Sequence, residues 1–225
     1  MNESGRDPFS QLLYPMLSPQ PAAGDDLVLE LARAPIEKSA ESNRLRLGLL
    51  DEFGDEIVRT AAEMALAFRN GGRLLALGNG GSATSAADIV TEMLAPSGGR
   101  RPIPALCLTN DIAVVTGIGN DVGFGDVFVR QIIALGRPED IVLAVSTSGN
   151  SENLVRGLGE ARRRGMSTIA ICGYDGGRLA QDLVADHCFI VRSSSVHRIQ
   201  EVQMTLYHLL TDLVQRALEG EPACA

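Results

Sequence analysis

The sequence predicts an α/β protein, in which helices cover both faces of a five-stranded parallel sheet and further helices come before the first strand. After about residue 72, short apolar runs of strand length alternate with longer segments of helical periodicity. Strand–helix alternation of this kind is typical of parallel sheets whose crossover helices cover both faces. The chain has 225 residues and 45% apolar content, which is enough for a sizeable core.

The N-terminal region divides into an irregular arm and a helical segment. Residues 1–26 contain four prolines among polar residues, so we expect an arm there, and residues 27–225 are expected to form one domain. Apolar residues recur at helical spacing over 27–69, and this predicts two or more helices, with breaks near Pro35 and at Gly54.

The alternating part begins with an apolar run and ends with a long helix. The predicted strands are Arg73–Leu77, Ile103–Leu108, Ile141–Ser146, Ser167–Cys172 and Cys188–Val191. The predicted helices are Thr84–Leu94, Asp111–Gly117, Asp126–Leu135, Asn153–Arg164, Leu179–Leu183 and Val196–Leu218. Right-handed crossovers would place the loops that follow the strands along one edge of the sheet, where open parallel sheets bind ligands.

Composition excludes several classes of protein. A net charge of -8 and an aromatic content of 4% without tryptophan argue against nucleic-acid binding. No segment approaches the roughly 20 apolar residues of a membrane span, so no membrane partner is expected. The first residues lack the basic start and apolar stretch of a signal peptide, so we expect the cytoplasm.

The first predicted strand runs into Gly78–Ser82, which we name the glycine turn. Glycines allow a ligand to approach the backbone closely, and the N–H groups of the helix that follows attract anions. A tight connection without a ligand is an equally good interpretation of these glycines by themselves. The turn matches neither a dinucleotide fingerprint nor a P-loop, so no nucleotide cofactor is expected.

The third predicted strand runs into Ser146–Ser151, which we name the hydroxyl turn. One of its hydroxyl or amide side chains would serve as a helix N-cap on structural grounds alone. A phosphate monoester uses several such donors, because its oxygens each accept more than one hydrogen bond. The absence of Lys and Arg from the turn favours recognition of a phosphorylated sugar by neutral groups.

These two turns, with Gly119-Asn120-Asp121 between them and Arg198-Ile199-Gln200-Glu201 near the end, resemble the sugar isomerase (SIS) domain, and most closely the phosphoheptose isomerases. The resemblance covers about residues 45–218. It implies a flavodoxin-like three-layer sandwich, a homotetramer, and active sites where subunits meet. It also implies conversion of sedoheptulose 7-phosphate to glycero-manno-heptose 7-phosphate through an enediol.

The resemblance also implies roles for individual residues. The substrate contacts would be Asn79, Gly80, Gly81, Ser82, Asn120, Asp121, Ser146, Thr147, Ser148, Ser151 and Gln200. The ligands of zinc, or of another divalent ion, would be Asp88, Glu92, Gln200 and His208. Two positions depart from the family, which has His at the position of Asp88 and Asp at the position of His197.

Glu92 and His208 are the candidates for acid–base catalysis. Isomerisation moves a proton between two carbons beside a carbonyl, so it needs a base over the C–H and an acid or metal at the oxygen. Asp88 and Glu92 are four apart on a predicted helix, which puts both carboxylates on one face, although an exposed acidic stripe would look the same. Gln200 and His208 are eight apart, about 12 Å along a helix, and could also be hydrogen-bonded interior groups.

Two alternatives to an isomerase stay open from the sequence. The chain could be a sensor that binds a phosphosugar without converting it. It could also be a protein-binding adaptor, similar to relatives that bind a replication initiator, with residues 1–26 available to dock a protein partner.

Overall fold

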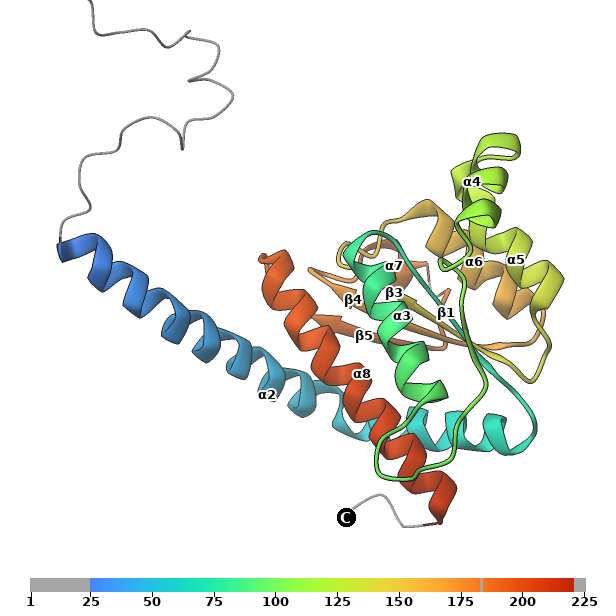
Figure 1. Ribbon diagram of the computed structural model, residues 1–225, viewed down its shortest axis with the longest axis horizontal. Coiled ribbons are helices and arrows are strands. Elements are labelled where there is room, and N and C mark those ends of the chain that lie inside the picture. Colours follow the sequence, from blue (N-terminus) through green and yellow to red (C-terminus); the bar gives the residue numbers. More distant parts are fainter. Residues whose placement is uncertain (1–24, 183, 221–225) are drawn as a thin grey trace, which may run out of the picture. The chain divides into compact units, whose positions relative to one another are not determined.

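The computed structural model describes residues 25–182 and 184–220. Its sheet has five parallel strands in the order β2-β1-β3-β4-β5, which confirms the predicted fold class (Figure 1). The strands are β1 (Leu74–Gly78), β2 (Ala105–Cys107), β3 (Ile141–Val145), β4 (Ser167–Gly173) and β5 (His187–Val191).

The central strands form because both of their faces are buried. Every residue of β1 and of β3 is buried, as expected for near-continuous apolar runs in a covered parallel sheet. The edge strand β2 is shorter than the predicted Ile103–Leu108, since it pairs with β1 alone, and its central residue Leu106 is exposed.

The helices lie in two layers around the sheet (Figure 1). They are α3 (Gly81–Leu94), α4 (Ile112–Asp121), α5 (Val127–Leu135), α6 (Glu152–Arg163), α7 (Gly177–Gln181) and α8 (Val196–Glu219), with a 3-10 turn, η2 (Phe124–Asp126). One apolar core joins the sheet to α3, α8 and the C-terminal part of the first helix, α2 (Asp25–Arg69), and a second joins it to α5, α6 and α7. Two cores on opposite faces of one sheet give the expected three layers.

A single helix, α2 (Asp25–Arg69), replaces the two or more helices predicted from the sequence, so that prediction is wrong. Pro35 is exposed inside it, and no atom lies within 4 Å of the place where Gly54 would carry a Cβ. The helix formers around Pro35 and the burial of Leu49 and Ile57 on either side of Gly54 offset the cost of these residues.

The chain forms two compact units whose boundary lies between Glu41 and Ser42, within α2. Most of the predicted arm, residues 1–24, lies outside the described residues, and Asp25 already belongs to the helix. Across the described parts of the chain, every helix is too short or too polar to cross a lipid bilayer.

Candidate functional site

The glycine turn and the hydroxyl turn lie side by side at the carboxyl edge of the sheet. Their strands β1 and β3 are neighbours, and Gly78 pairs with Val145, so both turns begin at the same level. The side chains of Asn79 and Asn153 exchange two hydrogen bonds across the gap, each 2.9 Å from Nδ2 to Oδ1. The sheet therefore brings together the two segments that the sequence singled out.

Local backbone geometry explains the residues of the glycine turn. Gly80 is the N-cap of α3 with φ +54°, which L side chains rarely adopt. A Cβ on Gly78 would lie 2.4 Å from the carbonyl oxygen of Ser82, so only glycine fits there. No side chain caps α3, and the hydroxyl of the buried Ser82 lies in its first turn. The N-terminus of α3 thus keeps its attraction for an anion.

The hydroxyl turn is closed by its own hydrogen bonds. The Oγ of Ser146 accepts from the backbone N–H of Gly149 at 3.0 Å, and the Oγ of Ser148 accepts from that of Asn150 at 3.3 Å. Ser151 is the N-cap of α6, yet its side chain makes no capping hydrogen bond. The capping interpretation therefore does not account for Ser151. Its hydroxyl, with that of the half-buried Thr147, is available to a ligand.

A cavity of about 580 Å³ lies between α3 and α8. It is lined by Gly81, Thr84, Ser85, Asp88, His197, Gln200, Glu201, Met204 and Tyr207. Gln200 lies over the glycine turn, since a Cβ on Gly81 would be 2.6 Å from its Nε2. The volume is within the usual range for small-molecule sites. One wall of the cavity thus begins at the glycine turn, and Asp88 lies further along α3.

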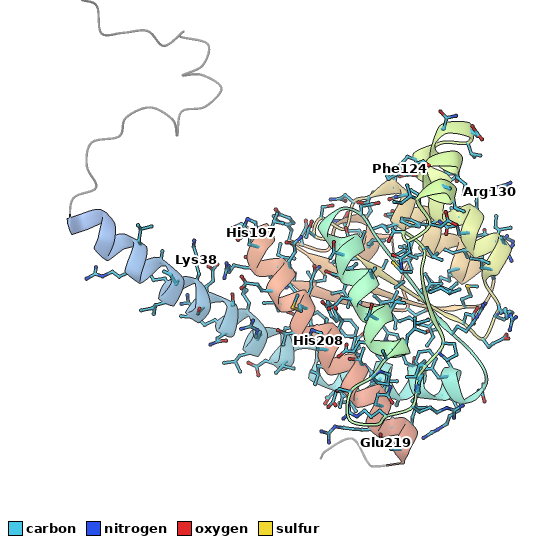
Figure 2. The ribbon with its side chains drawn as sticks, viewed as in Figure 1. Lys38, Phe124, Arg130, His197, His208 and Glu219 are labelled. Carbon is cyan, nitrogen blue, oxygen red and sulfur yellow. The ribbon has the colours of Figure 1, made fainter. Side chains whose placement is uncertain are left out.

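Glu92 and His208, the predicted acid–base pair, are in contact. The Nδ1 of His208 lies 3.1 Å from both carboxylate oxygens of Glu92. Thr211, one turn further along α8, donates its hydroxyl to the Glu92 Oε2 at 2.8 Å. Figure 2 shows His208 near the middle of α8 and His197 in its first turn. Two helices far apart in the sequence therefore assemble a carboxylate and an imidazole at hydrogen-bonding distance.

Asp88 is held by a residue that the sequence analysis did not single out. The hydroxyl of Tyr207 donates to the Asp88 Oδ2 at 2.7 Å, and that oxygen is 4.0 Å from the His208 Nε2. Burial and this hydrogen bond raise the pKa of Tyr207 above its ordinary value, so the phenol remains a donor. Asp88 and the other departure from the family, His197, line the same cavity from opposite helices.

The four predicted metal ligands do not surround a common point. The imidazole of His208 faces Glu92 with one nitrogen and Asp88 with the other, and a single ion takes only one nitrogen of a ring. Gln200 lies at Gly81, at the other end of α3. Within the described residues, no group of three or more His, Cys, Asp and Glu side chains is arranged to hold a metal. The residues as placed do not fit a zinc centre, and metal binding stays a prediction.

Asn120 and Asp121 lie at the end of α4, away from this cavity in the fold. Asn120 Nδ2 donates to Asp121 Oδ1 at 2.7 Å, and both residues are exposed. Asp121 lines a different hollow, formed with the apolar side of α4 and with Arg130. Neither residue lines the cavity between α3 and α8, so their role as substrate contacts stays a prediction.

Sequence reasoning missed three residues that organise the site: Asn153, Tyr207 and Gln203. Gln203 is fully buried and donates its Nε2 to the carbonyl oxygens of Ser146 (3.0 Å) and Ile171 (3.1 Å), so α8 holds the start of the hydroxyl turn. Gln203 stands between the apolar residues Val202 and Met204 and three residues after Gln200, which was an available signal. No such signal marks Tyr207 and Asn153 in the sequence, because their hydrogen-bond partners are more than 70 residues away.

Comparisons with known proteins show the family to which the chain is similar. The family model described as "SIS domain" matches residues 39–173. The phosphoheptose isomerase of Aquifex aeolicus is 43% identical over 176 residues, which cover 78% of this chain and 91% of that protein. The phosphoheptose isomerase of Halorhodospira halophila is also 43% identical, with 81% of this chain and 93% of that protein covered.

Solved structures show the same likeness. A phosphoheptose isomerase from Francisella tularensis superposes with a TM-score of 0.77 at 31% identity, covering 84% of this chain and 98% of that one. The phosphoheptose isomerase from Neisseria gonorrhoeae gives 0.75 at 35% identity, with 82% and 98% covered.

Proposed function

This chain belongs to the SIS domain family, in the group of the phosphoheptose isomerases, and we propose that it converts sedoheptulose 7-phosphate to glycero-manno-heptose 7-phosphate. The observation that carries the proposal is the placement of the acid–base pair Glu92–His208 on the same two helices, α3 and α8, that hold the two turns. A phosphate at the turns would leave the sugar to extend along these helices.

The hydroxyl turn and the N-termini of α3 and α6 bind the phosphate. Ser148, Ser151 and Thr147 offer hydroxyl donors, and neither helix has a side-chain cap that would compete. Two arginines near the turn are already paired, Arg178 with Glu152 and Asp182, and Arg192 with Glu52. Recognition therefore relies on neutral hydrogen bonds and helix termini, as the sequence predicts.

Glu92 and His208 move the protons. A carboxylate that takes the proton from the carbon beside the carbonyl leaves an enediol, and an imidazole that gives a proton to the carbonyl oxygen stabilises it. Thr211 and the His208 ring orient Glu92, so that its oxygens point toward α8. Return of the carbon-bound proton to the neighbouring carbon, while the hydroxyl on the first carbon gives its proton back to the imidazole and becomes the new carbonyl, completes the isomerisation.

The proposal includes a homotetramer. Helix α4 is rich in apolar residues, yet none of its ten residues is buried. Ile112 of this helix is 73% exposed, and Val122 and Phe124, just after its end, are 55% and 57% exposed; Figure 2 labels Phe124. A second copy covering this face would bury it and would carry Asn120 and Asp121 into a shared site. Sedimentation of the wild-type protein tests the assembly, and a monomer at micromolar concentration would contradict it.

A cytoplasmic location is also part of the proposal, because phosphorylated sugars are made and used there.

The need for zinc is tested together with the reaction. Sedoheptulose 7-phosphate is supplied to the full chain after chelation and after addition of zinc, and the aldose product is measured. We expect turnover in at least one condition. Tight binding of the substrate without product under every metal condition would replace the isomerase with the sensor alternative.

A further inference from the structure

The carboxamides of Asn79 and Asn153 form a closed pair between the two turns. Each Nδ2 donates to the Oδ1 of the other side chain at 2.9 Å, so each amide uses one donor and one acceptor within the pair. Asn153 is 2% exposed and Asn79 is half-buried. A pair with both bonds satisfied in a buried position has one stable arrangement.

The pair joins the starts of two helices. Asn79 stands between the last residue of β1 and Gly80, the N-cap of α3, and Asn153 stands in the first turn of α6. Both helix ends carry partial positive charge and N–H groups that suit an anion. The separation of these two ends decides whether one phosphate can reach both.

The rest of the hydroxyl turn is tied to other parts of the fold. Gln203 of α8 holds the Ser146 carbonyl oxygen, and Asn150 accepts a hydrogen bond from the backbone N–H of Arg178 at 3.0 Å. The Asn79–Asn153 pair links the first turn of α6, which follows the hydroxyl turn, to the glycine turn.

We infer that Asn79 and Asn153 are positioning residues whose pairing fixes the spacing of the two turns. The inference rests on the proposed function, because the spacing matters only if one phosphate is held between the turns. It adds a positioning role for the Asn79 side chain to the substrate contact that the resemblance implies.

A double-mutant cycle on the full chain tests the pair, with inorganic phosphate as the probe in calorimetry. Asn79→Ala and Asn153→Ala are each expected to weaken phosphate binding about 5- to 30-fold. The double variant is expected to bind phosphate with an affinity no lower than that of the weaker-binding single variant, because both changes remove the same interaction. Multiplied losses in the double variant would show that the two side chains act independently and would overturn the inference.

Two controls separate positioning from stability. Gln131 is also buried and donates to the carbonyl oxygens of Leu108 and Val127, outside both turns. Gln131→Ala is expected to lower the melting temperature while leaving phosphate affinity within about twofold. If the alanine variants at Asn79 or Asn153 do not fold, Asn153→Asp is used instead. It keeps the side-chain shape but cannot donate the hydrogen bond from position 153 to the Asn79 Oδ1. It is expected to weaken phosphate binding at least about tenfold.

The outcomes distinguish this inference from the proposed function. If the wild-type protein binds phosphate and the Asn variants bind it equally well, the pair is an ordinary core contact and only this inference fails. If the wild-type protein binds no phosphate, the proposed function and the inference fail together. With sedoheptulose 7-phosphate, the Asn variants are expected to raise KM while kcat stays within about threefold, since the acid–base pair is untouched.

Discussion

The two turns and the α3–α8 face differ in what holds their residues. In the hydroxyl turn, backbone bonds, a glycine at φ +65° and the buried amides of Gln203 and Asn153 fix the chain. On the α3–α8 face, Asp88, Glu92 and His208 have side chains that are 48%, 36% and 45% exposed and are held mainly by one another, Tyr207 and Thr211. The binding turns are part of the core, whereas the acid–base groups stand on helix surfaces.

This contrast is consistent with the two departures from the family pattern that the resemblance implies. A substitution on an exposed helix face, such as Asp88, changes the chemistry without disturbing the packing, because its new partner Tyr207 lies on the neighbouring helix. A substitution in the turns would disturb the sheet edge itself, and the turns keep every residue that the resemblance implies. Four experiments test this contrast.

The largest effect is expected from the acid–base pair. Glu92→Gln or His208→Asn should lower kcat about 10²- to 10⁴-fold, because each removes a group that transfers a proton. Phosphate affinity and the melting temperature should stay close to those of the wild type, since both side chains are partly exposed. Turnover assays with calorimetry check this. A parallel loss of phosphate binding would show that the two regions are not separate.

A substitution in the hydroxyl turn should act on stability. Gly149 has φ +65°, and a Cβ there would lie 1.9 Å from the carbonyl oxygen of Gly176. Gly149→Ala is expected to cost about 2 to 4 kcal/mol of unfolding free energy. Gly159, inside α6 with open space around it, is the matched control. Gly159→Ala should add about 0.5 to 1 kcal/mol. Equal effects in denaturant titrations would contradict the role of the turn.

Ser151→Ala should weaken phosphate binding about tenfold or more without a change in stability. Its hydroxyl makes no capping bond, so its loss costs the fold little, whereas a hydrogen bond to a charged ligand is worth about 1.5 to 3 kcal/mol. Ser97→Ala, at an exposed serine outside both turns, is the control. An unchanged affinity in Ser151→Ala would remove this hydroxyl from the phosphate site.

The smallest effect concerns Tyr207 at high pH. Its pKa is raised in the folded protein by burial and by Asp88, whereas in the unfolded chain it ionises near pH 10. The stabilisation that depends on the protonated phenol is therefore complete below about pH 10 and is lost as the pH rises further. The stability advantage of the wild type over Tyr207→Phe should shrink between about pH 10 and 11 in denaturant titrations. A constant difference would show that the phenol is not held in its protonated form.

The sequence predicted the parts of the site that depend on local pattern. Strand periodicity located the strands, and the position of each turn directly after a strand placed Gly78 and Ser146 at one sheet edge. The pairing of Glu92 with His208, suggested by the family resemblance, is seen in the structure. The prediction of helix breaks near Pro35 and at Gly54 was wrong, because local helix propensity does not include the packing of Leu49 and Ile57.

Spacing along the chain predicts the α/β class and the two turns, whereas the candidate acid–base residues come from the family resemblance. The tertiary structure alone decided that Tyr207 holds Asp88, that Asn153 pairs with Asn79, and that Gln200 lies over Gly81 and not beside His208. Those contacts join residues that are far apart in the sequence. They depend on how α3, α6 and α8 pack on the sheet, a geometry that no local pattern of residues encodes.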